Sequence, residues 1–120
     1  PMSDRSEIER AINLFIDAIN RNDSSQIPLT EDVVMSGPMM AEPTVGEAAV
    51  RTYLDETSPF VAHLDLKKVI IEGESAAIMV KFTGINGVII EGAEIFTFRD
   101  GKISSDKIFF DTRRLFKGAN

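Results

Sequence analysis

Residues Ala76–Phe110 read AAIMVKFTGINGVIIEGAEIFTFRDGKISSDKIFF. Three runs rich in Ile, Val and Phe are separated here by two short polar segments, Asn86-Gly87 and Arg99-Asp100-Gly101. Asn-Gly between β-rich runs is a strong signal for a two-residue hairpin loop, and a glycine that ends a three-residue loop supplies the left-handed conformation that a bulge requires. This segment therefore predicts consecutive antiparallel strands joined by tight turns.

The chain on either side extends this pattern into an α+β fold. Apolar residues at helical spacing predict a first helix that starts at a capping box of Ser6 and Glu9, and Thr44 with Glu47 predicts the start of a second helix from about Val45 to Thr57. Strands are predicted at Val61–Ile71, Ala76–Ile85, Val88–Phe98 and Lys102–Leu115, with a short β-like run at Val33–Met35. Helices followed by an antiparallel meander form one α+β domain over residues 1–120. Pro1 ahead of Met2 is interpreted as a cleaved-tag scar.

The composition excludes several classes of function. The 120 residues carry a net charge of −6, which opposes nucleic acid and anionic membrane surfaces as partners. There is no cysteine and only one histidine, His63, so no metal site of the zinc type is expected. No glycine-rich phosphate loop appears, so no cofactor is expected. No apolar run is long enough to span a membrane and no signal peptide opens the sequence, and we expect a cytoplasmic protein.

Turn type fixes strand register, so the neighbours of each strand residue can be predicted. A two-residue Asn-Gly loop places Lys81 opposite Gly92, and a three-residue Arg-Asp-Gly loop places Glu94 opposite Asp106. Alternation then puts on one face Met79, Lys81, Thr83, Ile90, Gly92, Glu94, Phe96, Asp106, Ile108 and Phe110. The opposite face carries Ile78, Val80, Phe82, Ala93, Ile95, Ile103, Phe109 and Asp111. Both faces are largely apolar and two helices can cover only one, so we expect the outer face to form a homodimer.

The predicted Glu94–Asp106 pair is the strongest candidate for chemistry. Like charges across strands repel, so one buried carboxyl group of the pair should keep its proton. Lys81 lies diagonally from Glu94 in this register and could offset the repulsion. Two alternatives stay open: the acids reach solvent or form an ordinary salt bridge with Lys81, or a two-residue Asp100-Gly101 turn places Glu94 opposite Lys107 and separates the pair.

The chain resembles the superfamily of ketosteroid isomerases and SnoaL-like polyketide cyclases, which have the nuclear transport factor 2 fold. The resemblance runs from FIDAINRND at Phe15–Asp23 to FFDTRRLF at Phe109–Phe116, and includes EPTVGEAAVRTYL at Glu42–Leu54 and FTFRDGKI at Phe96–Ile103. It implies a curved antiparallel sheet that wraps the N-terminal helices into a cone with one apolar pocket, and an outer sheet face that often dimerises.

The resemblance does not carry a complete catalytic set to this chain. The isomerase tyrosine position is Phe15, the base position is Gly37, and only the third position keeps an acid, Glu94. The epoxide hydrolases of the superfamily use an arginine and two aspartates, where this chain has Lys81, Thr83 and Ile108. SnoaL-like cyclases have an acid near the position of Ile108. In this chain the nearest acid on the same predicted face is Asp106, one inward-facing position earlier in the strand. The candidate catalytic residues are therefore Glu94, Asp106 and Lys81.

Other residues are candidates for contact with a substrate. Histidine is the side chain that normally changes charge near neutral pH, which makes His63 a candidate, although a lone histidine in a strand is more often structural. Tyr53 could donate a hydrogen bond to a ligand, or could pack with its hydroxyl at the surface. Met35 and Met39 could line an adaptable pocket mouth or belong to the core. The full candidate set is Phe15, Met35, Met39, Tyr53, His63, Thr83, Phe96, Ile108 and Phe110.

Two functions of different classes follow. The first is a small-molecule enzyme that uses general acid–base catalysis on a hydrophobic carbonyl compound, as an isomerase, dehydratase or cyclase, with Glu94 as acid, Asp106 as base and Lys81 as their electrostatic partner. The second is a binding protein for an apolar small ligand, or a dimeric assembly module without catalysis.

Overall fold

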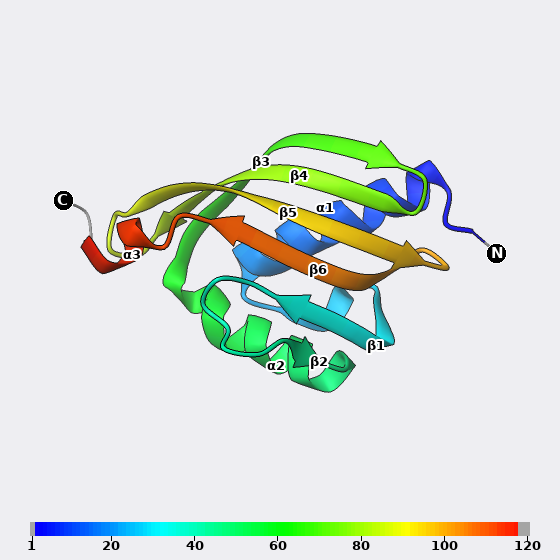
Figure 1. The fold of residues 1–120 in the computed structure, drawn as a ribbon, viewed down its shortest axis with the longest axis horizontal. Coiled ribbons are helices and arrows are strands. Elements are labelled where there is room, and N and C mark those ends of the chain that lie inside the picture. The colour runs from blue at the N-terminus through cyan, green and yellow to red at the C-terminus, as the bar shows by residue number, and fades with distance from the viewer. Residues whose placement is uncertain (1, 118–120) are drawn as a thin grey trace.

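The computed structural model describes residues 2–117 and places two long helices against one face of a six-stranded sheet (Figure 1). Pro1, interpreted above as a tag scar, lies outside the described residues. The helices are α1 (Arg5–Arg21), α2 (Glu47–Thr57) and the short α3 (Arg113–Lys117). The strands are β1 (Leu29–Ser36), β2 (Thr44–Val45), β3 (Val61–Glu72), β4 (Ser75–Gly84), β5 (Ile89–Arg99) and β6 (Lys102–Phe110), and single 3₁₀ turns lie at Ser24–Gln26 and Ser58–Phe60.

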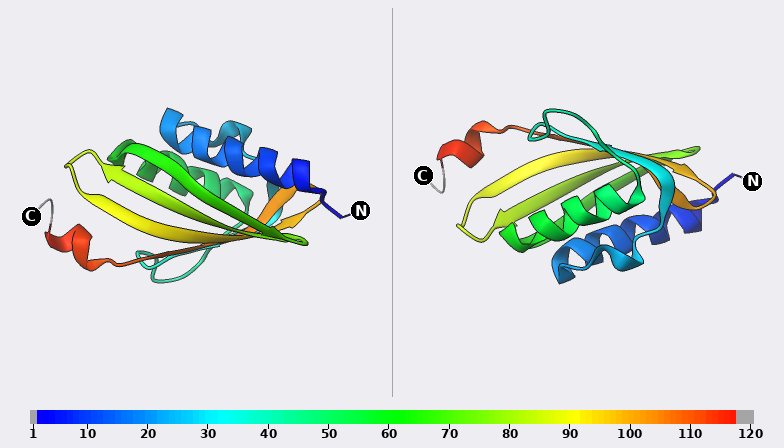
Figure 2. Two further views of the ribbon diagram at one scale, coloured as in Figure 1. Left: turned by 90° about the horizontal axis from the view of Figure 1, so that it is seen from above. Right: turned by 90° about the horizontal axis from the view of Figure 1, so that it is seen from below.

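The strand order is β2-β1-β6-β5-β4-β3, which confirms the α+β class. The pairs from β3 to β6 are antiparallel as predicted, but β1 runs parallel to β6, so the sheet is mixed. Figure 2 shows that the sheet is curved and open and that α1 and α2 lie on its concave side. None of the helices among residues 2–117 is long and apolar enough to cross a membrane.

Both long helices begin at other residues than the capping boxes predicted. The N-cap of α1 is Asp4, whose side chain accepts from the Glu7 backbone N–H while the Glu7 side chain accepts from the Asp4 backbone N–H, so the box lies two residues before the predicted one. Helix α2 begins at Glu47 after Gly46, which has a φ of 97° and offers no side-chain cap. The predicted cap residue Thr44 instead pairs with Met35 in the sheet.

The hairpin between β4 and β5 has a register one residue away from the prediction. The Gly84 N–H donates to the Val88 carbonyl, so the loop holds three residues and ends at Gly87, which has a φ of 87°. Lys81 consequently lies opposite Glu91 rather than Gly92. An odd register error moves every side chain of a strand to the other face. Ile78, Val80 and Phe82 therefore face the helices, whereas Met79, Lys81 and Thr83 face outward.

The hairpin between β5 and β6 combines a two-residue turn with a bulge. Arg99 pairs with Lys102 around Asp100-Gly101, and the register then shifts by one residue between Thr97 and Phe98. The bulge explains why Ile103 and Asp106, three residues apart, are both buried on the concave side. Glu94 lies opposite Ile108, and Asp106 lies opposite Phe96. The predicted direct pairing of Glu94 with Asp106 is therefore wrong by two residues, but the two acids lie on the same face as diagonal neighbours.

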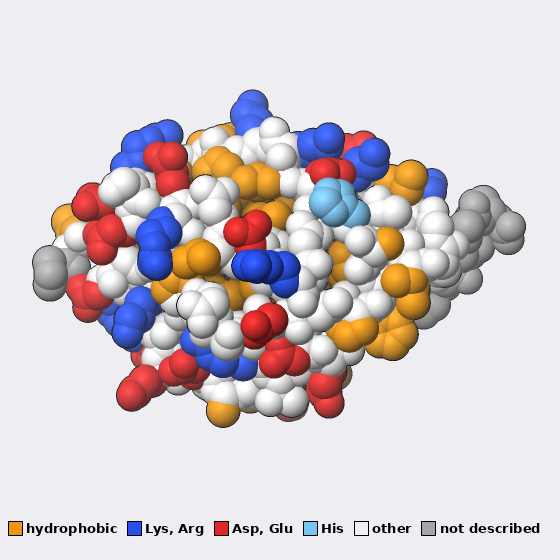
Figure 3. All heavy atoms as spheres, turned by 180° about the vertical axis from the view of Figure 1, so that it is seen from behind, with side chains coloured by type: hydrophobic (Ala, Val, Ile, Leu, Met, Phe, Trp, Pro, Cys, Tyr) orange, Lys and Arg blue, Asp and Glu red, His pale blue; other side chains and the backbone are white. Residues whose placement is uncertain are grey.

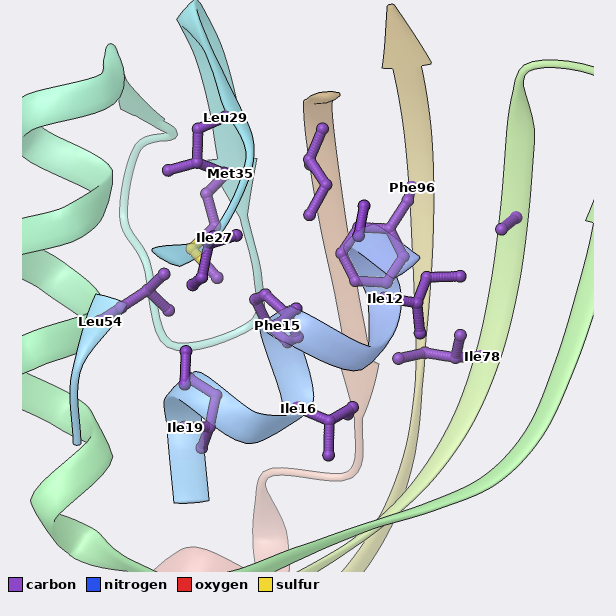
Figure 4. Close-up of a cluster of buried hydrophobic side chains, with 14 of the residues drawn as sticks. Ile12, Phe15, Ile16, Ile19, Ile27, Leu29, Met35, Leu54, Ile78 and Phe96 are labelled. Carbon is purple, nitrogen blue, oxygen red and sulfur yellow. The ribbon is translucent and has the colours of Figure 1, made fainter. Parts of the chain in front are cut away.

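The core fills the space between α1, α2 and the concave face. Phe15 of α1 and Phe96 of β5 meet edge to face, with ring centroids 5.3 Å apart (Figure 4). Phe96 is fully buried, and Figure 4 shows side chains from both helices gathered around this contact. Burial of such large apolar side chains is the main favourable contribution to the stability of this fold.

The outer face of the sheet remains apolar. Large hydrophobic side chains from four strands are substantially exposed there, namely Ile70, Met79, Ile89, Ile95 and Phe109. Register places Met79, Ala93 and Phe109 side by side across three strands.

Candidate functional site

A cavity of about 420 Å³ lies between the ends of the helices and the sheet. Its wall comes from α1, α2, the end of β1 with the segment after it, and strands β3 to β6, and Leu115 of α3 lies at the same end. Two wall residues, Met39 and Phe60, are 51% and 64% exposed, so the cavity opens to solvent. Figure 3 shows the side of the molecule opposite to that in Figure 1, where hydrophobic side chains form several small patches and charged side chains of both signs are scattered between them.

The structure brings six of the nine predicted substrate-contact residues to this cavity, and their contact with a ligand stays a prediction. They are Phe15, Met35, Met39, Tyr53, Ile108 and Phe110. Phe96 lies in the core behind Phe15 instead. His63 pairs with Thr83 across β3 and β4, away from the cavity wall, and His63 Nε2 lies 2.9 Å from Asp65 Oδ1. Neither residue is among those that line the cavity, and Thr83 faces outward because the register of β4 differs from the predicted one, so contact of these two residues with a ligand stays a prediction.

Glu94 is the one charged side chain in the wall of this cavity among the described residues. It is only 5% exposed, because Phe15, Met35 and Ile108 lie in the same wall. Asp106 is 4% exposed and lies deeper, against a void of about 10 Å³ that is otherwise lined by apolar side chains. The two acids therefore lie at different depths: Glu94 lines the cavity, and Asp106 lies behind it in the core.

A hydrogen bond between the two carboxyl groups, which requires one of them to be protonated, lowers the pKa of Glu94 and raises that of Asp106. Glu94 Oε1 and both oxygens of Asp106 are buried and have no other hydrogen-bond partner. Because an unpaired buried charge is costly, a shared proton is the arrangement that satisfies these atoms.

Burial raises the pKa values of both acids, and each acid also changes the pKa of the other. Burial raises the pKa of Asp106 well above its usual range, and the charge of Glu94 and the hydrogen bond to it raise that pKa further. Burial also raises the pKa of Glu94, while the hydrogen bond from Asp106 opposes this rise. The pair therefore keeps one proton between its two carboxyl groups, and Glu94 is the member of the pair that lines the cavity.

Lys81 does not join this pair. It lies on the outer face, between Asp65 of β3 and Glu91 of β5 in the sheet register. The prediction that it neighbours Glu94 is wrong, because the three-residue loop after Gly84 turns it away. Within the part of the chain that the structure describes, no lysine, arginine or histidine lines the cavity.

Two hydroxyl groups complete the polar side chains of interest in the wall. Burial raises the pKa of the Tyr53 phenol, so it is a neutral donor at physiological pH. Ser58, at the end of α2, is 2% exposed, and its Oγ has no hydrogen-bond partner. Sequence reasoning missed Ser58, because a serine before a proline after a helix is an ordinary helix end.

No metal centre accompanies these groups. Within residues 2–117, no group of three or more acidic or histidine side chains is arranged to hold a metal ion. The described site consists of the Glu94–Asp106 pair, the hydroxyl groups of Tyr53, Thr57 and Ser58, and an otherwise apolar wall.

Comparison with known proteins places this arrangement in a family. The family model of the SnoaL-like domain matches residues 12–105. No curated protein matches the chain in sequence at a significant level.

Solved structures reproduce the fold at low sequence identity. An NTF2-like protein of unknown function from Mesorhizobium loti superposes with a TM-score of 0.80 at 18% identity, over 92% of this chain and 96% of that one. A protein from Jannaschia sp. CCS1, provisionally described as a SnoaL-like polyketide cyclase, gives 0.81 at 13% identity over 98% and 96% of the two chains. A protein from Kribbella flavida DSM 17836, provisionally described as a ketosteroid isomerase, gives 0.75 at 21% identity over 88% and 78%. At these identities the structures establish the shared NTF2-like fold, and the family model, which matches most of the sequence, establishes that the chain belongs to the SnoaL-like family.

Proposed function

We propose that this protein is an enzyme that moves a proton on a hydrophobic carbonyl compound, in an isomerisation, dehydration or cyclisation. The observation that carries the proposal is the buried Glu94–Asp106 pair at an otherwise apolar cavity. A carboxylate with a raised pKa is a stronger base than an ordinary surface glutamate, and its pKa lies closer to neutral pH.

The different depths of the two acids suggest roles opposite to those the sequence predicted. Glu94 is the base: its carboxylate takes a proton from the carbon next to the substrate carbonyl and can return it to another carbon or to a leaving oxygen. Asp106 is a positioning residue, which keeps its own proton and orients Glu94 through the shared hydrogen bond. Tyr53 and Ser58 are the neutral donors in the same wall that could meet the carbonyl oxygen as negative charge develops on it.

The experiment is exchange of hydrogen for deuterium next to the carbonyl in a panel of hydrophobic ketones, followed by proton NMR in D₂O. We expect catalysed exchange for at least one ketone, and a loss of about 100-fold or more in Glu94→Gln, because positioned acid–base groups contribute on this scale. Asp106→Asn should shift the pH dependence of exchange, since the supporting group can then no longer ionise.

The control is Glu91→Gln, which removes a carboxylate from the outer face of the same strand. It should leave the rate within about twofold, as is usual for a surface substitution. Undiminished exchange in folded Glu94→Gln would rule out Glu94 as the base.

A non-catalytic binding protein is the second candidate, and a specific observation favours it. Phe15, Gly37 and Ile108, which occupy the positions where the resemblance would place catalytic groups, all line the cavity without a polar side chain. A thermal-shift screen with steroids, terpenoids and aromatic polyketides separates the two candidates. Stabilisation by a ligand without any exchange or turnover would support binding alone.

We also propose that the protein is a homodimer through its outer sheet face. The support is the set of five exposed hydrophobic side chains on that face, because monomers rarely leave a contiguous apolar patch uncovered. Sedimentation at several concentrations tests this proposal, and a monomer at all of them would exclude it.

A further inference from the structure

The cavity holds a negative charge without a counter-charge. When the carboxyl pair has lost one of its two protons, it carries one negative charge, and Glu94 brings that charge to the wall. None of the described residues that line the cavity is basic. The titratable groups that face Glu94 within this cavity and the small void behind it are Tyr53 of α2 and Asp106 of β6, and neither supplies a positive charge.

A second polar group in the wall also lacks a partner. Ser58 Oγ accepts and donates no hydrogen bond, although only 2% of Ser58 is exposed. It comes from the α2 side of the cavity, whereas Glu94 comes from the sheet. Its unused lone pairs mark a second position at which a ligand with N–H donors can be held.

The remaining wall suits an apolar cation. Phe15, Tyr53, Phe60, Phe82 and Phe110 place five aromatic rings around the cavity. The faces of aromatic rings attract cations as well as apolar groups, and this attraction is stronger in a desolvated site than in water.

We propose that this cavity binds lipophilic primary amines, with the ammonium group paired to the Glu94 carboxylate and the hydrocarbon part among the aromatic side chains. This ligand class goes beyond the proposed proton transfer and requires no reaction. Anionic compounds of the same shape are excluded, because their carboxylate would meet Glu94 with no cation in the described wall to offset the repulsion.

Desolvation of the charged groups normally weakens a buried ion pair, and for Glu94 this desolvation is already part of the folded state. An ion pair loses stability mainly because both ions leave water, but Glu94 is desolvated before any ligand arrives. The amine therefore has to lose only its own hydration. Since burial raises the pKa of Glu94, lowering the pH should weaken amine binding in a range above the usual titration of a glutamate.

The test compares three probes that share one hydrocarbon part: 4-phenylbutylamine, 4-phenylbutan-1-ol and 4-phenylbutyrate. Their affinities are measured by isothermal titration calorimetry at pH 8, with the full chain. We expect the amine to bind about 10- to 100-fold more tightly than the alcohol, which is the scale of a charge-assisted hydrogen bond. The butyrate should bind most weakly of the three.

Matched variants assign the preference to its residues. Glu94→Gln should reduce the advantage of the amine over the alcohol to within about threefold, whereas Glu91→Gln on the outer face should preserve it. Ser58→Ala keeps the packing of a small residue and should weaken the amine more than the alcohol. The melting temperature of each variant shows that the fold is retained before affinities are compared.

Equal affinity of the amine and the alcohol for the wild-type protein would overturn the inference. An amine preference that survives in folded Glu94→Gln would overturn it as well. Proton exchange on ketones is measured separately, so a protein that binds amines but exchanges no proton would refute the proposed function and leave this inference intact.

Discussion

The substitution Asp106→Asn should change how protein stability depends on pH. Asparagine keeps the shape of the side chain and can donate a hydrogen bond to Glu94, but it cannot ionise. In the wild-type protein, burial raises the pKa of Asp106 well above the value near 4 of an unfolded aspartate. Above about pH 4 the folded state therefore binds more protons than the unfolded state, so this group lowers the free energy of unfolding as the pH rises.

The size of this effect follows from linkage. While the folded protein keeps one proton that the unfolded chain has released, the free energy of unfolding falls by about 1.4 kcal/mol per pH unit. Between pH 5 and pH 7 the variant should therefore gain up to about 3 kcal/mol relative to the wild type. Below pH 4 the two proteins should differ least, because aspartate is then protonated in both states.

The assay is guanidinium chloride unfolding of both proteins at several pH values between 4 and 8. Titrating groups other than Glu94, whose pKa depends on Asp106, cancel in the difference between the two curves. Glu91→Gln serves as the surface control, with a difference that stays within about 0.5 kcal/mol. A difference between Asp106→Asn and wild type that does not change with pH would refute the claim that Asp106 keeps its proton in the folded state.

Three further predictions address the core, the position of Lys81 and the outer face. Phe96→Ala should lower the free energy of unfolding by about 3–5 kcal/mol, because Phe96 is fully buried against Phe15; a loss below about 1 kcal/mol in chemical denaturation would contradict this packing. Lys81→Met should leave the pH dependence of ketone exchange unchanged, since Lys81 faces outward. A shift of the pH–rate profile in this variant would show instead that Lys81 acts on the carboxyl pair. Ile95→Lys should shift a dimer toward the monomer in sedimentation by introducing a charge into the exposed apolar face, and an unaltered dimer would place the interface elsewhere.

Sequence patterns were sufficient to predict the elements but not every register. Hairpin chemistry predicted β4, β5 and the start of β6 at nearly their observed bounds, because runs of Ile, Val and Phe between Gly-containing turns leave few alternatives. The predicted end of the last strand at Leu115 was wrong, since β6 ends at Phe110 and α3 begins at Arg113. The prediction for the loop at Asn86-Gly87 was wrong by one residue, since a two-residue turn and a three-residue loop with a final glycine share the same signal. That odd error alone moved Lys81 and Thr83 to the wrong face.

The carboxyl pair was predicted on a common face for a different reason. The predicted pairing of β5 with β6 was wrong by two residues, and an even error preserves the face. The bulge in β6 turns both Ile103 and Asp106 inward. No residue in this segment predicts it, because Ser104 and Ser105 fit a regular strand and a bulge equally well. The layering of Asp106 behind Glu94, and with it the assignment of base and proton holder, depends on packing of distant segments that local sequence patterns do not encode.

A carbon-detected NMR titration of the Glu94 and Asp106 carboxyl groups, assigned with the single amide variants, observes the shared proton itself. If the pair shares a proton in a buried site, both carboxyl signals should respond to each other's titration, and at least one should titrate well above the usual range of a carboxylic acid, at about pH 6 or higher. Independent titration of both groups near pH 4 would contradict the shared proton and, with it, the assignment of Glu94 as base.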